Sequence, residues 1–211
     1  MADASLAGES LADFAAALAA REPVPGGGGA AAYVGALAAA LCSMVGEFTR
    51  GKRRYERYER DIQGMLETAE ATRARLVQLV DEDAEAFLPL AQAYASPKGD
   101  PARADAIERA TKGATQAPHE MMRQVCDTIE LLEEMGQKGS RMLLSDVGCG
   151  ALLARAALEA ASLNVFVNTR SLQDRAWAGR LDADCDRMLD EYSPRAERLA
   201  REVMDRVRAG G

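Results

Sequence analysis

The stretch Val24-Pro25-Gly26-Gly27-Gly28-Gly29-Ala30-Ala31-Ala32 stands between two predicted helices and decides how closely they meet. Proline sets its own φ and keeps the preceding residue out of the helical region, so the chain enters extended. Four consecutive glycines cost more ordering entropy than a simple turn requires. Two interpretations fit: a tight connection between packed helices, or a group held close to the backbone. Free N–H groups at the start of the next helix would favour an anion or a carbonyl oxygen there.

The segment after the glycines predicts a buried helix. Residues 30–45 carry no charged side chain and are dominated by alanine. Residues 24–46 are uncharged as well, which raises the question of a membrane span. The many glycines and the low content of leucine and isoleucine instead favour a buried helix after a loop. We therefore expect no membrane association.

The composition predicts an all-α protein. A chain of 211 residues can build one substantial core, and no linker divides it, so we expect a single domain over residues 1–211. Hydrophobic residues make up 48% and aromatic residues only 5%, and alanine dominates, which is typical of helices. The net charge of −7 argues against general affinity for nucleic acid.

Cysteine and histidine usage limits the chemistry. The cysteines are widely separated and form no Cys-x-x-Cys motif, which predicts neither a zinc site nor a disulfide framework. The single histidine, His119, excludes a site with two histidine ligands, and we expect it at the surface or at a helix cap. No secretory signal is evident, so we expect a cytoplasmic protein. Without metal or cofactor, its chemistry would use carboxylates, amides, lysine, tyrosine or backbone groups.

Hydrophobic periodicity predicts an antiparallel bundle of about six to eight helices. One of them is long and should be kinked at Pro89. The predicted helices cover approximately residues 11–23, 29–49, 52–95, 102–116, 118–136, 145–162 and 174–206.

Polar residues interrupt the apolar faces of two of these helices. Asp83 shares a face with Leu76 and Phe87, where a carboxylate must be hydrogen-bonded, paired or functional. Asp146, Asn164 and Asn168 share one face if their helix continues past residue 164. An extended piece over residues 165–167 would break that alignment. Structural and functional roles both remain open for these residues.

Basic residues cluster over residues 50–60. Residues 46–52 nearly match a phosphate-binding loop, but Arg53 stands where a serine or threonine must bind magnesium, and no strand precedes. A nucleotide site is therefore rejected. The cluster is either a solvated helix face or an anion-binding patch.

Four motifs together resemble the formiminotetrahydrofolate cyclodeaminase and methenyltetrahydrofolate cyclohydrolase family. Their order and spacing match that family from about Leu11 to Arg206. The motifs are residues 25–32, residues 49–55, residues 81–87 followed by Pro97-Lys98, and Ser145-Asp146 followed by residues 164–168. The chain departs at Gly29, where many cyclodeaminases carry serine and stand-alone cyclohydrolases resemble this chain. A Gly-Asn pair common before the Ser-Asp motif is also absent here.

The resemblance implies an all-helical homodimeric enzyme that acts on a tetrahydrofolate, which is polyglutamylated in many relatives. We expect hydrolysis of 5,10-methenyltetrahydrofolate to 10-formyltetrahydrofolate, because no formiminotransferase segment precedes residue 1. The alternative is a formiminotetrahydrofolate cyclodeaminase, which releases ammonia and forms 5,10-methenyltetrahydrofolate. A more distant alternative is a helical binding protein without turnover.

The resemblance also assigns roles to residues. Asp83 and Asp146 would be catalytic, one stabilising the folate cation and the other accepting a proton from water. Lys98 would polarise a substrate oxygen or pair with an acid. We expect the two aspartates close together, in an apolar seam near the glycines. The substrate-binding residues would be Pro25, Gly26, Gly27, Gly28 and Gly29 against the ring, Asn164 and Asn168 on the pterin or the adding oxygen, and Lys52, Arg53 and Arg54 on the glutamate tail.

Overall fold

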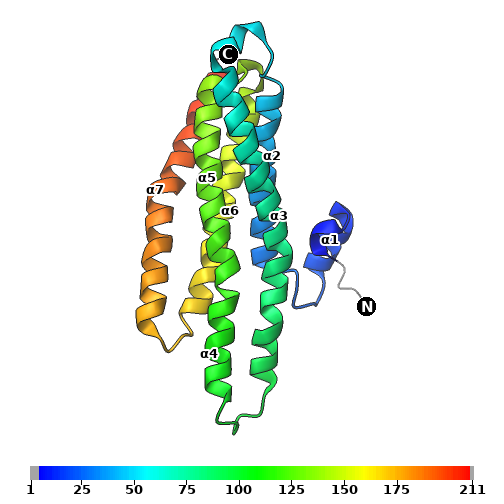
Figure 1. Cartoon of the computed structure of the whole chain (residues 1–211), viewed down its shortest axis with the longest axis vertical. Coiled ribbons are helices and arrows are strands. Elements are labelled where there is room, and N and C mark those ends of the chain that lie inside the picture. Colours follow the sequence, from blue (N-terminus) through cyan, green and yellow to red (C-terminus); the bar gives the residue numbers. More distant parts are fainter. Residues whose placement is uncertain (1–4, 210–211) are drawn as a thin grey trace.

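The computed structural model describes residues 5–209, which form seven α-helices and no β-strand (Figure 1). Short 3-10 turns stand before α1, α3 and α6, at Leu6–Gly8, Arg53–Tyr58 and Arg141–Leu143. The α-helices are α1 (Leu11–Ala19), α2 (Gly27–Glu47), α3 (Glu59–Ala95), α4 (Arg103–Ala114), α5 (Gln116–Lys138), α6 (Leu144–Thr169) and α7 (Arg175–Arg208).

Four long helices, α2, α3, α5 and α6, pack around one core. Contacts join α2 to α3 and α6, and α5 to the same two helices, so each helix has two neighbours around the bundle. The chain runs up α2, down α3, up α4 and α5, down α6 and up α7 in Figure 1. α7 lies along α5 and α6, while α4 extends the line of α5 and packs on α3. The predicted all-α antiparallel bundle is confirmed.

Small residues let the central helices approach one another closely. The core side of α2 is built largely from alanine and glycine, and Ala32, Ala38 and Ala39 are fully buried. A Cβ added to Gly35 would lie 2.9 Å from a methyl group of Val125, and one added to Gly150 would lie 2.7 Å from Leu132. α2 and α6 therefore sit against α5 at a spacing that larger side chains would prevent.

Several predicted boundaries differ from the structure. α2 begins at Gly27, so three of the four glycines are helical, and α1 ends at Ala19. The chain forms a 3-10 turn over residues 53–58 before α3 begins at Glu59. α3 continues through Pro89 to Ala95. α6 runs unbroken to Thr169, so residues 165–167 are helical and not extended.

The prediction for His119 is wrong. Its side chain is buried in the first turn of α5, and its Nε2 lies 2.8 Å from Oδ2 of Asp184 on α7. Burial is the main cause of the lowered pKa of His119, and Asp184 opposes that shift. The position looked exposed in the sequence because α7, which covers it, is remote along the chain.

The two most apolar helical segments lie side by side in the bundle. By length and composition alone, Gly27–Glu47 and Arg141–Thr169 could each cross a membrane. Of their most apolar windows, 56% and 44% respectively are buried inside the structure. The predicted buried helix after the glycines is thus confirmed, and each helix also keeps an apolar face outward.

The contact between α6 and α7 offers a test of this close packing. A Cβ on Gly148 would lie 2.7 Å from Cγ1 of Val203, a stiff β-branched side chain, whereas a Cβ on Gly179 meets no atom within 4 Å. We expect Gly148→Ala to lower the free energy of unfolding by about 1–2 kcal/mol through overpacking. Gly179→Ala should raise it by up to about 1 kcal/mol. The measurement is the free energy of unfolding in urea. A Gly148→Ala variant more stable than Gly179→Ala would contradict this packing.

Candidate active site

A cavity of about 240 Å³ lies where the start of α2 meets α3 and the end of α6. It gathers three of the four consecutive glycines with one carboxylate and two carboxamides. The lining residues are Pro23, Val24, Gly26, Gly27, Gly28, Asp83, Phe87, Leu90, Ala114, Asn164, Val167 and Asn168. Six predicted site residues from three separate motifs thus meet in one place.

The carboxylate of Asp83 lies directly against the first turn of α2. A Cβ on Gly28 would collide with both carboxylate oxygens, so the Asp83 side chain can take this position only because residue 28 is glycine. The backbone N–H of Gly29 donates a hydrogen bond to the carboxylate. This N–H belongs to the first helical turn, where no intrahelical acceptor is present and the helix dipole favours an anion. The glycines predict that some group lies close to the backbone here, and the Asp83 carboxylate of the same chain is one such group.

Burial controls the acidity of Asp83. Desolvation raises its pKa above the ordinary value of 3.8, and the hydrogen bond from Gly29 partly offsets that rise. No cationic side chain of residues 5–209 contributes to the shift. A partly buried carboxylate without a cationic partner favours a positively charged ligand, and it can exchange a proton near neutral pH more readily than an exposed aspartate.

The two asparagines line the same cavity from the last turns of α6. Asn164 Nδ2 donates to the carbonyl of Ala160 at 2.9 Å, and Asn168 Nδ2 donates to the carbonyl of Ala114 at 3.2 Å. A Cβ on Gly27 would lie 3.7 Å from both polar atoms of the Asn164 amide. These contacts hold two planar amides beside the glycine backbone, which suits a flat heterocycle with polar edges.

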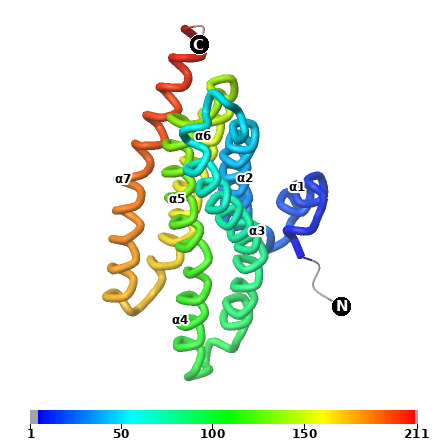
Figure 2. Tube along the Cα trace, turned by 45° about the horizontal axis from the view of Figure 1, so that its top comes forward, coloured from blue at the N-terminus to red at the C-terminus, as the bar shows by residue number. Residues whose placement is uncertain are grey.

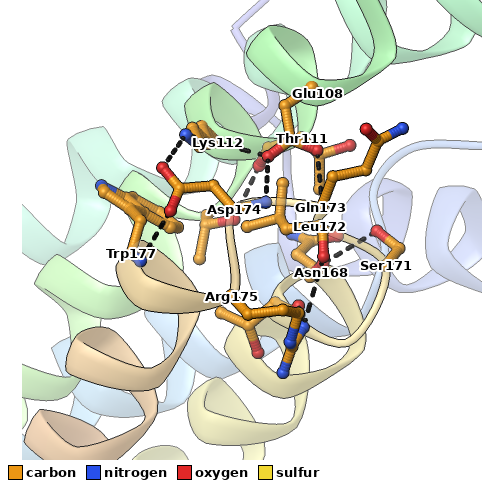
Figure 3. Close-up of polar contacts among 12 residues, drawn as sticks. Glu108, Thr111, Lys112, Asn168, Ser171, Leu172, Gln173, Asp174, Arg175 and Trp177 are labelled. Carbon is orange, nitrogen blue, oxygen red and sulfur yellow. Dashed lines mark hydrogen bonds and ion pairs between the residues drawn. The ribbon is translucent and has the colours of Figure 1, made fainter. Parts of the chain in front are cut away.

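A network at the end of α6 holds the Asn168 wall in place (Figure 3). The Glu108 carboxylate on α4 accepts hydrogen bonds from the backbone N–H groups of Gln173 and Asp174, at 2.8 and 3.0 Å. Lys112 pairs with Asp174 at 2.7 Å, and Asp174 also caps α7 by accepting from the Trp177 N–H. The turn between α6 and α7 is thereby tied to α4, which carries the acceptor for Asn168.

Some lining residues were not predicted as site residues. Phe87 and Leu90 follow Asp83 by one and two helical turns, so they share its face and line the same cavity. Their spacing from Asp83 in the sequence could have predicted both Phe87 and Leu90 as lining residues. Val167 lines the cavity although its side chain is 67% exposed. Pro25 is buried and Gly29 contacts Asp83 from behind, so neither is part of the lining.

Asp146 does not join this cavity within one chain. It lies in the first turn of α6, 18 residues before Asn164 on the same helix. At 1.5 Å per residue this is a separation of about 27 Å. The expectation that Asp83 and Asp146 lie close together is therefore wrong for the single chain. A shared helical face puts residues on one line, but it says nothing of their distance along that line.

The predicted basic residues also lie elsewhere. Lys98 is exposed in the turn after α3, about 18 Å along the helix beyond Asp83. Lys52, Arg53 and Arg54 precede α3 at its other end, about 36 Å from Asp83. Arg54 lines a second cavity of about 690 Å³, which Arg57, Arg141 and Arg206 also line. This end of the bundle thus carries a basic pocket, and the Asp83 end carries the carboxylate and the amides.

Comparisons with known proteins agree with the motifs. Residues 10–187 match the family model described as formiminotransferase-cyclodeaminase. A methenyltetrahydrofolate cyclohydrolase from Methylorubrum extorquens is 39% identical over 94% of this chain and 98% of its own length. A formimidoyltransferase-cyclodeaminase from Mus musculus is 31% identical over 91% of this chain, which spans 36% of that protein.

A solved structure extends this agreement to the fold. The crystal structure of a formiminotetrahydrofolate cyclodeaminase from Thermotoga maritima matches with a TM-score of 0.82 and 30% identity. The match covers 93% of this chain and 98% of that one. Sequence, site and fold point the same way, and the chain belongs to the formiminotransferase-cyclodeaminase family.

Proposed function

We propose that the protein is an enzyme of folate one-carbon metabolism that hydrolyses 5,10-methenyltetrahydrofolate to 10-formyltetrahydrofolate. The observation that carries this proposal is Asp83, a half-buried carboxylate without a cationic partner among the described residues, which lines a small cavity together with two held carboxamides. The substrate is a flat pterin joined to a delocalised cation, so it supplies the missing positive charge. The cyclohydrolase from Methylorubrum extorquens, similar over nearly its whole length, supports this reaction.

The reaction requires a group that moves protons and a stabilised cation. Water adds to the carbon that bridges N5 and N10, and its proton passes to a carboxylate. The remaining hydroxyl then loses its proton as the C=O bond of the formyl group forms and the bond from that carbon to N5 breaks. N5 takes up one proton, and the formyl group stays on N10.

In this proposal Asp83 stabilises the cation or accepts the proton. Asp146 would take the other role only from a second copy of the chain, because within its own chain it lies about 27 Å along α6 from Asn164. Asn164 and Asn168 orient the pterin or the adding oxygen.

The second candidate is the cyclodeaminase reaction, in which N10 attacks a formimino carbon and ammonia leaves. The Thermotoga maritima structure and the Mus musculus relative favour it. Both reactions form a tetrahedral carbon beside N5 and N10, and so both can use the same carboxylate. The cavity fits both reactions equally, because both use the Asp83 carboxylate although their attacking atoms and leaving groups differ.

Offering each substrate to the purified protein separates the two reactions. With 5,10-methenyltetrahydrofolate, we expect the absorbance of the methenyl group to disappear faster than in buffer. With 5-formiminotetrahydrofolate, we expect neither ammonia nor methenyl absorbance. Release of ammonia with a gain of methenyl absorbance would assign the cyclodeaminase reaction instead, and no turnover of either substrate would overturn the proposal.

Asp83→Asn tests the role of the carboxylate. We expect kcat/KM to fall by about 10²- to 10⁴-fold, because the amide neither accepts a proton nor carries the charge that stabilises a cation. Asp127→Asn is a control: desolvation raises the pKa of Asp127 too, but this residue is more exposed than Asp83 and its carboxyl on α5 does not line the cavity. Near-normal turnover by Asp83→Asn would contradict the assignment.

The raised pKa of Asp83 adds a pH and stability signature. If the ionised form is required, wild-type activity should decline with falling pH at values above 3.8, the ordinary pKa of aspartate. The folded state binds this proton more tightly than the unfolded state, so ionising Asp83 costs stability at neutral pH. We therefore expect Asp83→Asn to melt at least as high as wild type at pH 7, an advantage that disappears below the unfolded pKa. A lower melting temperature at pH 7 would contradict this account.

Gly28→Ala tests the contact between α2 and Asp83. The new Cβ would meet both carboxylate oxygens and push the side chain out of place, and we expect about a 10²-fold loss of kcat/KM. Gly64→Ala is the matched control, because a Cβ there meets no atom within 4 Å. Equal activity of the two variants in a steady-state assay would show that the position of Asp83 is not critical.

We also infer that the protein is a cytoplasmic homodimer that needs no cofactor and binds neither nucleic acid nor membranes. The outward apolar faces of α2 and α6 support association with a second copy. Arg54 and its neighbours Lys52 and Arg53 would contact the glutamate tail of a polyglutamylated tetrahydrofolate. That contact should weaken with added salt, since these side chains are exposed.

A further inference from the structure

We propose that Asp81 is a positioning residue for substrate binding, because it attaches the N-terminal segment of residues 5–24 to α3 beside the cavity that contains Asp83. We call this segment the N-terminal strap and this cavity the substrate cavity. The inference rests on the proposed function, since it concerns how the folate cavity keeps its shape. The strap supplies part of the cavity wall, and Asp81 acts on a bound substrate only through the strap.

The Asp81 carboxylate holds the first residues of the strap. Its Oδ2 accepts a hydrogen bond of 2.6 Å from the Ser5 hydroxyl, and its Oδ1 accepts one of 3.2 Å from the backbone N–H of Ala7. Hydrogen bonds to an ionised carboxylate are about twice as strong as those between neutral groups. The turn Leu6–Gly8 also contacts α3, and Leu6 and Ala7 pack against the hydrophobic core. Both oxygens of one side chain therefore attach the strap to α3.

The middle of the strap is α1, which has few contacts of its own. It stands beside the bundle in Figures 1 and 2, and none of its residues is buried. Leu11 is 69% exposed and Leu18 is 40% exposed. Phe14 reaches Tyr33 of α2, with ring centroids 5.7 Å apart. A helix of nine residues is marginal in water without packing, so the strap depends on the attachment at its start.

The strap ends at Pro23 and Val24, which line the substrate cavity. Residues 20–25 form bends that belong to no helix. Within the part of the chain that the structure describes, residues 21–25 take part in no backbone-to-backbone hydrogen bond outside the helices. This part of the cavity wall is therefore held by packing against its neighbours and not by secondary structure of its own.

Val24 links the start of the strap to its end. A second cavity, of about 270 Å³, lies between the start of the strap, Val24 and one side of α3. Its lining residues are Ser5, Leu6, Val24, Asp81, Ala84, Glu85 and Leu88. Val24 thus lines both this cavity and the substrate cavity. Release of the strap at its start removes neighbours that hold Val24 in the wall.

Asp81 and Asp83 lie on different sides of α3. Two residues along a helix correspond to a rotation of about 200°. Accordingly, Asp81 lines the second cavity and Asp83 lines the substrate cavity, and neither lines both. Asp81 is therefore not a catalytic residue, because its carboxylate does not reach a substrate beside Asp83.

Loss of the attachment should weaken binding and leave the chemical step unchanged. Pro23 and Val24 are apolar and carry no group that can move a proton. Their contact with a flat ring is equally strong in the ground state and the transition state. Removal of such uniform binding raises KM and leaves kcat unchanged.

Asp81→Ala tests the attachment, and Glu85→Ala is the matched control. Glu85 also lines the second cavity, and it follows Asp83 by two residues, as Asp81 precedes it by two. The hydrogen bonds from Ser5 and Ala7 go to Asp81 and not to Glu85. We expect Asp81→Ala to raise KM for 5,10-methenyltetrahydrofolate about 10-fold, with kcat within about twofold of wild type. Glu85→Ala should change neither, and a wild-type KM for Asp81→Ala would overturn the proposal.

The separate values of KM and kcat distinguish positioning from a general loss of structure. A partly unfolded variant contains fewer active molecules, so its apparent kcat falls while its KM stays the same. That pattern in Asp81→Ala would contradict the proposal. Asp81→Asn should restore KM to within about threefold of wild type, because its amide can accept from Ala7 and donate to Ser5. If Asp81→Asn raised KM as much as Asp81→Ala, the hydrogen bonds would not be the cause.

Ser5→Ala tests the same attachment from the strap. Ser5 is exposed, so this substitution removes one hydrogen bond without opening the core. We expect KM to rise about threefold in the wild-type background and not to rise further when residue 81 is already alanine. Equal effects of Ser5→Ala in the two backgrounds would show that Ser5 and Asp81 act independently, which overturns the proposal.

Hydrogen exchange provides a readout that does not depend on activity. We expect backbone N–H groups of the strap to exchange about 10-fold faster in Asp81→Ala than in wild type, and Glu85→Ala to match wild type. Exchange in α6 should be the same in all three proteins. Equal exchange of the strap in Asp81→Ala and wild type would overturn the attachment. Failure of the proposed function is distinguishable, because wild type would then turn over no folate while the difference in exchange would remain.

Discussion

The contact between the Asp83 carboxylate and the first turn of α2 is the constraint on which the rest of the site depends. It exists only because Gly28 has no side chain and because the Gly29 N–H lies where a helix start leaves a donor without an intrahelical acceptor. The same contact joins the start of α2 to α3 beside the cavity that both helices line. The glycine backbone at the start of α2 therefore positions the proposed catalytic carboxylate.

In this contact, few interactions offset the desolvation of the Asp83 carboxylate. One backbone hydrogen bond opposes the desolvation of Asp83, and no cationic side chain of the described residues assists. The ionised Asp83 therefore lowers the stability of the ligand-free protein, and a cationic ligand would balance its charge. Such a site gives up stability to gain affinity for a delocalised cation, which is a common relation between activity and stability. Phe87 and Leu90 strengthen the effect, because they keep water from solvating the carboxylate.

The elongated shape of the bundle separates the other functional groups. Long helices packed through alanine and glycine make a thin rod, with the amides and Asp83 near one end and Asp146 and the arginines at the other. A monomer of this shape cannot fold its ends together without breaking helices. The proposed homodimer would bring opposite ends of two chains together without breaking a helix.

The sequence by itself determined the helical class, the buried helix after the glycines and the carboxylate on the apolar face of α3, because helical periodicity and glycine chemistry are local properties. It also determined the family, through the order and spacing of four motifs. Only the tertiary structure decided that Asp83 meets Gly28, that Asp146 lies about 27 Å along α6 from the Asn164 of the same cavity, and that α7 buries His119. The physical reason is that periodicity assigns a residue to a face, whereas distances between residues depend on how long helices are and how they pack.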